Sequence, residues 1–201
     1  MLDARLRPLI DPPLEAVARV LARHGIGADA LTLAALVASL ATAAAIAAGL
    51  YGIALAALAL SRLLDGLDGP VARRTAATDR GGYLDSVCDY VFYGSVPFAF
   101  ALADPARNAL PAAALLASFL LTAVTFLAYA ALAARRGLET TARGRKSFFY
   151  AGGLVEGTET IAVFAAMLAW PAWFPVLAWG CAAACVLTAL LRTRSALRTF
   201  G

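Results

Sequence analysis

DGLDGPVARRTAATDRGGYLDSVCD, residues 65–89, contains five aspartates, and four of them lie in or beside segments that are otherwise apolar enough to cross a bilayer. They are Asp65, Asp68, Asp85 and Asp89. A charged side chain at the centre of a membrane helix costs roughly 2.5–3.5 kcal/mol, so the set costs on the order of 10 kcal/mol. Such a cost indicates that the carboxylates bind something. Carboxylate oxygens are ligands that suit hard divalent cations.

The spacing of these aspartates predicts two pairs on two helices. The first pair is separated as i, i+3 and the second as i, i+4, so the members of each pair share one helix face. Four carboxylates from neighbouring helices can surround two divalent ions and balance their charge. Two metal ions can clamp the attacking and leaving oxygens of a phosphoryl transfer.

The residues around the pairs suit a bound phosphate. Gly69 has no side chain, so a phosphate can approach the backbone closely. Ala72, on the same helix face, keeps that wall shallow, and Arg73 supplies a permanent cation. Gly81 opens the helix that carries the second aspartate pair.

Composition predicts an all-α integral membrane protein. The chain has 201 residues, of which 62% are hydrophobic, whereas soluble domains have about 45–50%. Six candidate spans are each near the roughly 20 residues that a crossing needs. They are 29–49, 52–72, 82–103, 109–134, 150–170 and 172–191.

We expect one domain over residues 1–201, formed by a juxtamembrane segment (1–24) and a six-helix bundle (29–191). Pro12 and Pro13 interrupt the first segment, and residues 14–23 after them are typical of an amphipathic helix at the membrane surface. The three cysteines lie in apolar segments without metal-site spacing, which indicates small core residues.

The placement of Lys and Arg predicts the orientation, because cytoplasmic loops carry an excess of these residues. With six crossings, one side carries every Lys and Arg except Arg107 and Arg62, which is inside a span. We therefore expect a protein of the cell (inner) membrane with both termini in the cytosol. The loop between the aspartate pairs lies on the same side, so the site should open to the cytosol.

The motif resembles the signature of the CDP-alcohol phosphotransferase family, DxxDGxxAR followed by GxxxDxxxD. The motif covers residues 65–89, and the six-span layout is similar to that of the family over nearly the whole chain. In one respect the chain departs from the family. Seven residues separate Arg73 from Gly81, where eight is common, so Gly81 and Gly82 are both candidates for the glycine of the motif.

The resemblance implies a metal-dependent transferase of phospholipid biosynthesis. Such an enzyme takes a CDP-linked lipid, commonly CDP-diacylglycerol, and an alcohol acceptor. It releases CMP and forms a phosphodiester lipid. Family members are usually homodimers, so we expect a homodimer in the lipid bilayer, with no nucleic-acid partner.

The resemblance also implies residue roles. The ligands of two divalent cations, Mg²⁺ or Mn²⁺, would be Asp65, Asp68, Asp85 and Asp89. Asp89 would also be the general base on the acceptor hydroxyl. The residues lining the nucleotide and its pyrophosphate would be Gly69, Ala72, Arg73 and Gly81.

Two polar groups outside the motif have open interpretations. Glu156 and Glu159, inside the fifth span, could line the acceptor site or form a structural pair that satisfies Arg62 or the helix backbone, and the acceptor role is slightly favoured. The run Arg143–Lys146 could bind lipid headgroups or form a phosphate pocket. The identity of the acceptor cannot be read from these residues.

Two other functions compete with the transferase. An intramembrane prenyltransferase also uses aspartate-rich helices, but it needs more spans and two separate aspartate motifs. A cation transporter would need polar residues that continue to the outer face, and the spans have few acids in their outer halves. A transporter would also leave Gly69, Ala72 and Arg73 unexplained.

Overall fold

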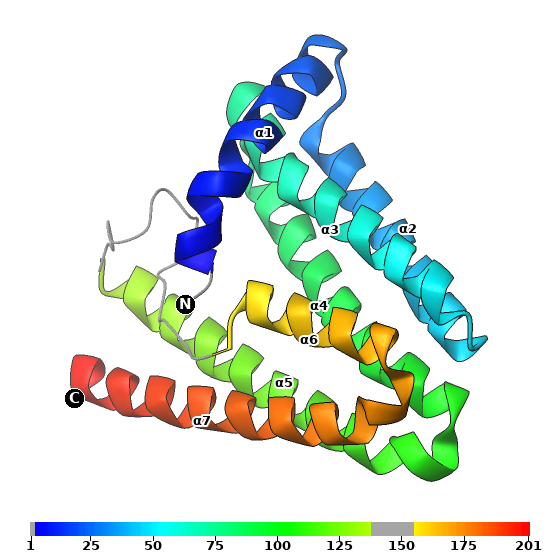
Figure 1. The fold of residues 1–201 in the computed structure, drawn as a ribbon. Coiled ribbons are helices and arrows are strands. Elements are labelled where there is room, and N and C mark those ends of the chain that lie inside the picture. Colours follow the sequence, from blue (N-terminus) through cyan, green and yellow to red (C-terminus); the bar gives the residue numbers. More distant parts are fainter. Residues whose placement is uncertain (1–2, 138–154) are drawn as a thin grey trace.

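The computed structural model describes residues 3–137 and 155–201, and this part of the chain is helical with no strand. Figure 1 shows how the helices are arranged. Their bounds are α1 Asp3–Arg23, α2 Ala28–Ala47, α3 Tyr51–Arg74, α4 Asp79–Ala103, α5 Pro105–Arg135, α6 Gly157–Ala169, the short 3₁₀ turn η1 Pro171–Trp173, and α7 Phe174–Phe200. The expected all-α fold is confirmed.

The helices pack in two groups that share α4. Helix α2 runs along both α3 and α4, while α5 runs along α4 and α7 (Figure 1). Aromatic rings fill the junction, where Phe100 stacks on Phe174 with ring centroids 4.2 Å apart. Phe92 and Phe164 are fully buried in the same cluster. The arrangement leaves the C-terminal half of α3 facing the N-terminal half of α4.

Four helical segments are long and apolar enough to cross a membrane, namely Ala28–Ala47, Asp79–Ala103, Pro105–Arg135 and Pro171–Phe200. Of the other two expected spans, α3 carries the charges of the first aspartate pair, and α6 has 13 residues. The beginning of the expected span 150–170 lies outside the described residues. The membrane character is therefore supported, and the count of six crossings stays a prediction.

Helix α1 begins well before the expected residue 14, because it continues through Pro12 and Pro13. Ala18 is fully buried, and the cluster around it includes Leu67 and Val71 of α3. This contact places α1 across the end of α3 that carries the aspartates (Figure 1). Whether the helix is amphipathic at a membrane surface stays a prediction.

The cysteines are buried and free, as expected for core residues: they are Cys88, Cys181 and Cys185.

Candidate metal centre

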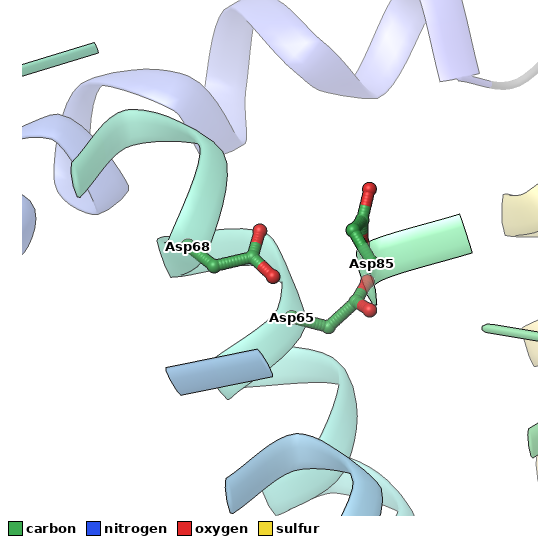
Figure 2. A group of neighbouring side chains, drawn as sticks. All are labelled: Asp65, Asp68 and Asp85. Atoms are coloured by element: carbon green, nitrogen blue, oxygen red, sulfur yellow. The ribbon is translucent and has the colours of Figure 1, made fainter. Parts of the chain in front are cut away.

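Helices α3 and α4 bring three of the four predicted aspartates together. Each of Asp65, Asp68 and Asp85 offers one carboxylate oxygen, and these oxygens lie within 4.8 Å of one another. Figure 2 shows Asp65 and Asp68 extending from α3 toward the start of α4, where Asp85 lies. Metal–oxygen distances of about 2.0–2.1 Å for Mg²⁺ place its ligands within about 4.2 Å of one another. The three oxygens therefore need only small shifts to surround one ion.

A third helix orients the most buried of these carboxylates. Thr32, on α2, donates its hydroxyl hydrogen to Oδ2 of Asp68 over 2.7 Å. Asp68 is 8% exposed and Thr32 is 4% exposed, so the bond is shielded from water. Groups that bind the ligands of a metal in this way fix their orientation.

The fourth aspartate, Asp89, has a different neighbour. Its Oδ1 accepts a hydrogen bond from Nη1 of Arg62 over 3.0 Å, and the same Nη1 lies 3.4 Å from Oδ2 of Asp65. Asp89 is one turn beyond Asp85 on α4, on the same face. A buried cation thus links the fourth carboxylate to the group of three.

The residues expected around the nucleotide lie at the cytosolic end that we predict for these helices. Arg73 is exposed, and its Nη2 donates to Oε1 of Glu15 over 2.8 Å. A Cβ placed on Gly69 would lie 3.6 Å from Nη1 of Arg73, which is ordinary contact. Ala72 is half-buried one turn after Gly69.

Gly81 lies at the crowded N-terminus of α4. Its N–H donates to Oγ1 of Thr78, the N-cap residue, over 3.0 Å. A Cβ at Gly81 would come within 3.2 Å of Oδ1 of Asp29 and 3.3 Å of the Thr78 hydroxyl. This position therefore favours glycine on steric grounds, whichever glycine aligns with the motif.

Glu15 of α1 contacts the C-terminal end of α3, which the sequence did not predict. In addition to Arg73, it accepts hydrogen bonds from Nε and Nη2 of Arg74. The hydrogen bonds from Arg73, and then from Arg74, lower the pKa of the Glu15 carboxyl below its ordinary value. In the sequence Glu15 is one of three acids before the first span, together with Asp3 and Asp11, so nothing there singled it out.

A second polar region lies between α4, α5, α6 and α7. A cavity of about 160 Å³ is bordered by Tyr90, Tyr93, Thr122, Glu156 and Arg192, among others. Arg192 is 8% exposed, and its Nη1 donates to the backbone carbonyl of Thr122 over 2.9 Å. Tyr93 is one turn beyond Asp89 on α4, so the cavity begins close to the aspartates.

Glu156 and Glu159 have a structural role at the start of α6. The backbone N–H of Glu156 donates to Oε2 of Glu159 over 3.2 Å, and the Glu156 side chain caps the backbone in return. This capping box satisfies backbone groups at the helix N-terminus. Glu156 also borders the cavity, so the structural and acceptor-side interpretations are compatible. The Arg143–Lys146 run lies outside the described residues.

A family model of CDP-alcohol phosphatidyltransferases matches residues 26–191 of the chain. Inner membrane protein YnjF of Escherichia coli is 46% identical over 199 residues, which cover 99% of this chain and 97% of that protein. Archaetidylinositol phosphate synthase of Pyrococcus horikoshii is 32% identical over 105 residues, 52% of this chain and 56% of that protein.

Two solved structures of the phosphatidylinositol phosphate synthase PgsA1 of Mycobacterium tuberculosis share the fold. One, in complex with manganese and citrate, has a TM-score of 0.74 at 23% identity, covering 92% of this chain and 88% of that one. The other has CDP-DAG bound and a TM-score of 0.73 at 24% identity, covering 91% of this chain and 92% of that one.

Proposed function

The chain belongs to the CDP-alcohol phosphatidyltransferase family, and we therefore propose that it transfers a phosphatidyl group to an alcohol. The donor is a CDP-linked lipid, CDP-diacylglycerol, and the products are CMP and a phosphodiester lipid. The similar fold of PgsA1, which has been solved with CDP-DAG bound, supports this donor. The observation that carries the proposal is the convergence of Asp65, Asp68 and Asp85.

The residues present fit a divalent metal. Carboxylate oxygens are hard ligands that Mg²⁺ and Mn²⁺ prefer, and three of them already converge. We propose that Asp65, Asp68 and Asp85 hold one ion and that Asp89 joins them to hold a second. When bound, the ions neutralise the diphosphate and stabilise the charge that develops on its oxygens. The PgsA1 complex with manganese supports this metal class.

In the proposed reaction, the acceptor hydroxyl gives its proton to the Asp89 carboxylate. The hydroxyl oxygen forms a bond to the phosphorus that carries the diacylglycerol. The bond from that phosphorus to the bridging oxygen breaks, and its electron pair leaves with CMP. A base is needed because a neutral hydroxyl is a poor nucleophile. Arg73 would bind the diphosphate, and Gly69, Ala72 and Gly81 would line its site.

We place the alcohol acceptor in the cavity beside Tyr93. A cavity of about 160 Å³ is close in size to an engineered cavity of about 150 Å³ that binds benzene, so it suits a small molecule. The Tyr93 hydroxyl and the Glu156 and Arg192 side chains at its border are hydrogen-bonding groups for a polar alcohol.

The test is CMP release by the purified chain in detergent, with CDP-diacylglycerol, Mn²⁺ or Mg²⁺, and a panel of small alcohols. One alcohol should support turnover, and Asp89→Asn should abolish it while the protein stays folded. Thermal protection by CDP-diacylglycerol, compared with a prenyl pyrophosphate, separates this function from a prenyltransferase. Substantial turnover by Asp89→Asn would refute the base, and protection by the prenyl pyrophosphate alone would refute the donor.

We further propose a single domain that crosses the inner membrane six times, with both termini and the metal centre facing the cytosol, assembled as a homodimer. The distribution of Lys and Arg supports this orientation. Because the native cysteines are buried, single cysteines introduced near each terminus report orientation by labelling in intact cells and in lysed cells. Labelling of both sites in intact cells by a membrane-impermeant reagent would contradict it.

A further inference from the structure

Arg62 lies inside the acid cluster, although no part of the proposed reaction uses it. Its Nη1 is 3.0 Å from Oδ1 of Asp89 and 3.4 Å from Oδ2 of Asp65. The Arg62 side chain is 11% exposed. Its charge is therefore removed from water and acts strongly on the two carboxylates.

Groups other than the carboxylates hold this guanidinium in place. Its Nη2 donates to Oγ of Ser61 over 3.0 Å and lies 3.4 Å from Oγ of Ser39. The two serine hydroxyls are 2.7 Å apart and fully buried. On the other side, the ring of Phe92 lies 3.8 Å from Cζ, a cation–π contact. Arg62 is thus anchored between α2, α3 and α4 and can stay in place if Asp89 turns away.

The charges of the cluster decide how many ions the free protein holds. When the four carboxylates are ionised, they and Arg62 together carry three negative charges among the described residues, and one divalent ion leaves a single one. A second ion would reverse the sign and bring net positive charge into a poorly solvated site, which is costly. It would also compete with Arg62 for Asp89 and Asp65. The diphosphate of a CDP-linked donor brings the negative charge that removes this cost.

We propose that Arg62 is a positioning residue that holds Asp89 away from the metal centre until the diphosphate binds. The free protein then takes up one divalent ion, on Asp65, Asp68 and Asp85, and the second ion arrives only with the nucleotide. This inference rests on the proposed function, from which it takes the ions and the CDP-linked donor. The alternative is that Arg62 only neutralises buried acid and stabilises the fold.

The experiment counts bound Mn²⁺ per chain by equilibrium dialysis of metal-stripped protein, with and without CDP as the soluble diphosphate. A compartment with CDP and no protein corrects for Mn²⁺ bound to the nucleotide. Wild-type protein should bind one ion without CDP and two with it. Arg62→Met should bind two ions in both conditions, and Arg62→Lys, which keeps the charge, should behave as wild type.

A matched control removes a cation elsewhere. Arg136, at the end of α5, donates to backbone oxygens of Thr199 and Phe200, so Arg136→Met should keep the wild-type stoichiometry. If Arg62→Met does not fold, Arg62→Gln tests the same loss of charge with a hydrogen-bond donor retained. For each of these variants the result is the number of bound Mn²⁺ ions per chain, which does not depend on turnover.

The results separate the inference from the function. Two ions on the wild-type protein without CDP, or one ion on folded Arg62→Met without CDP, would overturn the role of Arg62 and leave the transferase intact. Failure of every folded variant to bind Mn²⁺ would instead remove the metal centre and with it the proposed function.

Discussion

The carboxylate of Asp68 depends on a hydroxyl from a helix that carries none of the four aspartates. Thr32 donates to it over 2.7 Å in a buried setting. Loss of one partner of a buried charged group leaves that group unsatisfied, which costs about 1–3 kcal/mol or more. The bond therefore matters both for the packing of α2 on α3 and for the direction in which Asp68 points.

Thr32→Val should weaken Mn²⁺ binding about 10- to 100-fold, the usual range for the loss of a group that orients a metal ligand. The measurement is the Mn²⁺ dissociation constant by dialysis. Thr42→Val is the matched control, because Thr42 is also on α2 and fully buried, and its hydroxyl donates to the carbonyl of Ala38 in the same helix. Equal affinities for the two variants would show that Thr32 does not orient the centre.

Gly81→Ala tests the crowded start of α4. The added methyl group would lie 3.2 Å from Asp29 and 3.3 Å from the capping hydroxyl of Thr78, so the cap must shift. Loss of an N-cap costs about 0.5–2 kcal/mol, and we expect a lower melting temperature together with slower CMP release. Gly180→Ala is the control, because nothing lies within 4 Å of a Cβ there. A Gly81→Ala variant that matches it in both measurements would contradict the steric argument.

At the scale of helices, the contact between α1 and α3 includes charges as well as the apolar cluster around Ala18. Glu15 bridges Arg73 and Arg74 at the end of α3. Because Arg73 is also the proposed ligand of the diphosphate, α1 holds in the free protein a residue that the substrate needs. The N-terminal helix therefore belongs to the site, although it carries none of the residues of the motif.

Acid should weaken this contact. The pKa of Glu15 is lowered in the folded protein, so its stabilising contribution is present above the ordinary pKa and is lost as the pH falls through the lowered pKa. We expect lower protection factors for the amide hydrogens of α1 below about pH 4, and an effect of at most about 1 kcal/mol because the pair is near the surface.

Glu15→Gln should remove this pH dependence, whereas Asp11→Asn, an exposed substitution on the same helix, should retain it. Protection factors in α1 that fall equally with pH in both variants would exclude the pairing as the cause. The same pair of variants, compared by the KM for CDP-diacylglycerol, shows whether releasing Arg73 helps the donor to bind.

The sequence predicted the helices that carry the aspartates, because a hydrophobic span and an i, i+3 spacing are local properties. It also predicted that all four aspartates converge, and the structure groups three of them. It did not predict the partner of Asp89, since Arg62 is 27 positions away and the two residues meet only because α3 and α4 both pack on α2. It assigned Glu156 and Glu159 by burial cost alone, and the capping box of α6 accounts for part of that cost.

Across the whole molecule, the candidate metal centre lies where polar side chains of several helices meet. Carboxylates from α3 and α4, a hydroxyl from α2 and a guanidinium meet there, while the aromatic cluster holds the other ends of α4 and α7 together. Without ions, the carboxylates of α3 repel those of α4. Bound ions should therefore act as a clamp between these helices.

This clamp predicts that the melting temperature depends on metal. Mn²⁺ at 100 times its dissociation constant should stabilise the folded protein by about 2.7 kcal/mol, because an ion that binds only the folded state shifts the equilibrium by mass action. A chelator should reverse the shift. Asp68→Asn should lose the response, since it removes the most buried ligand. If it keeps the full Mn²⁺ response, the ions stabilise the protein from somewhere other than the facing surfaces of α3 and α4.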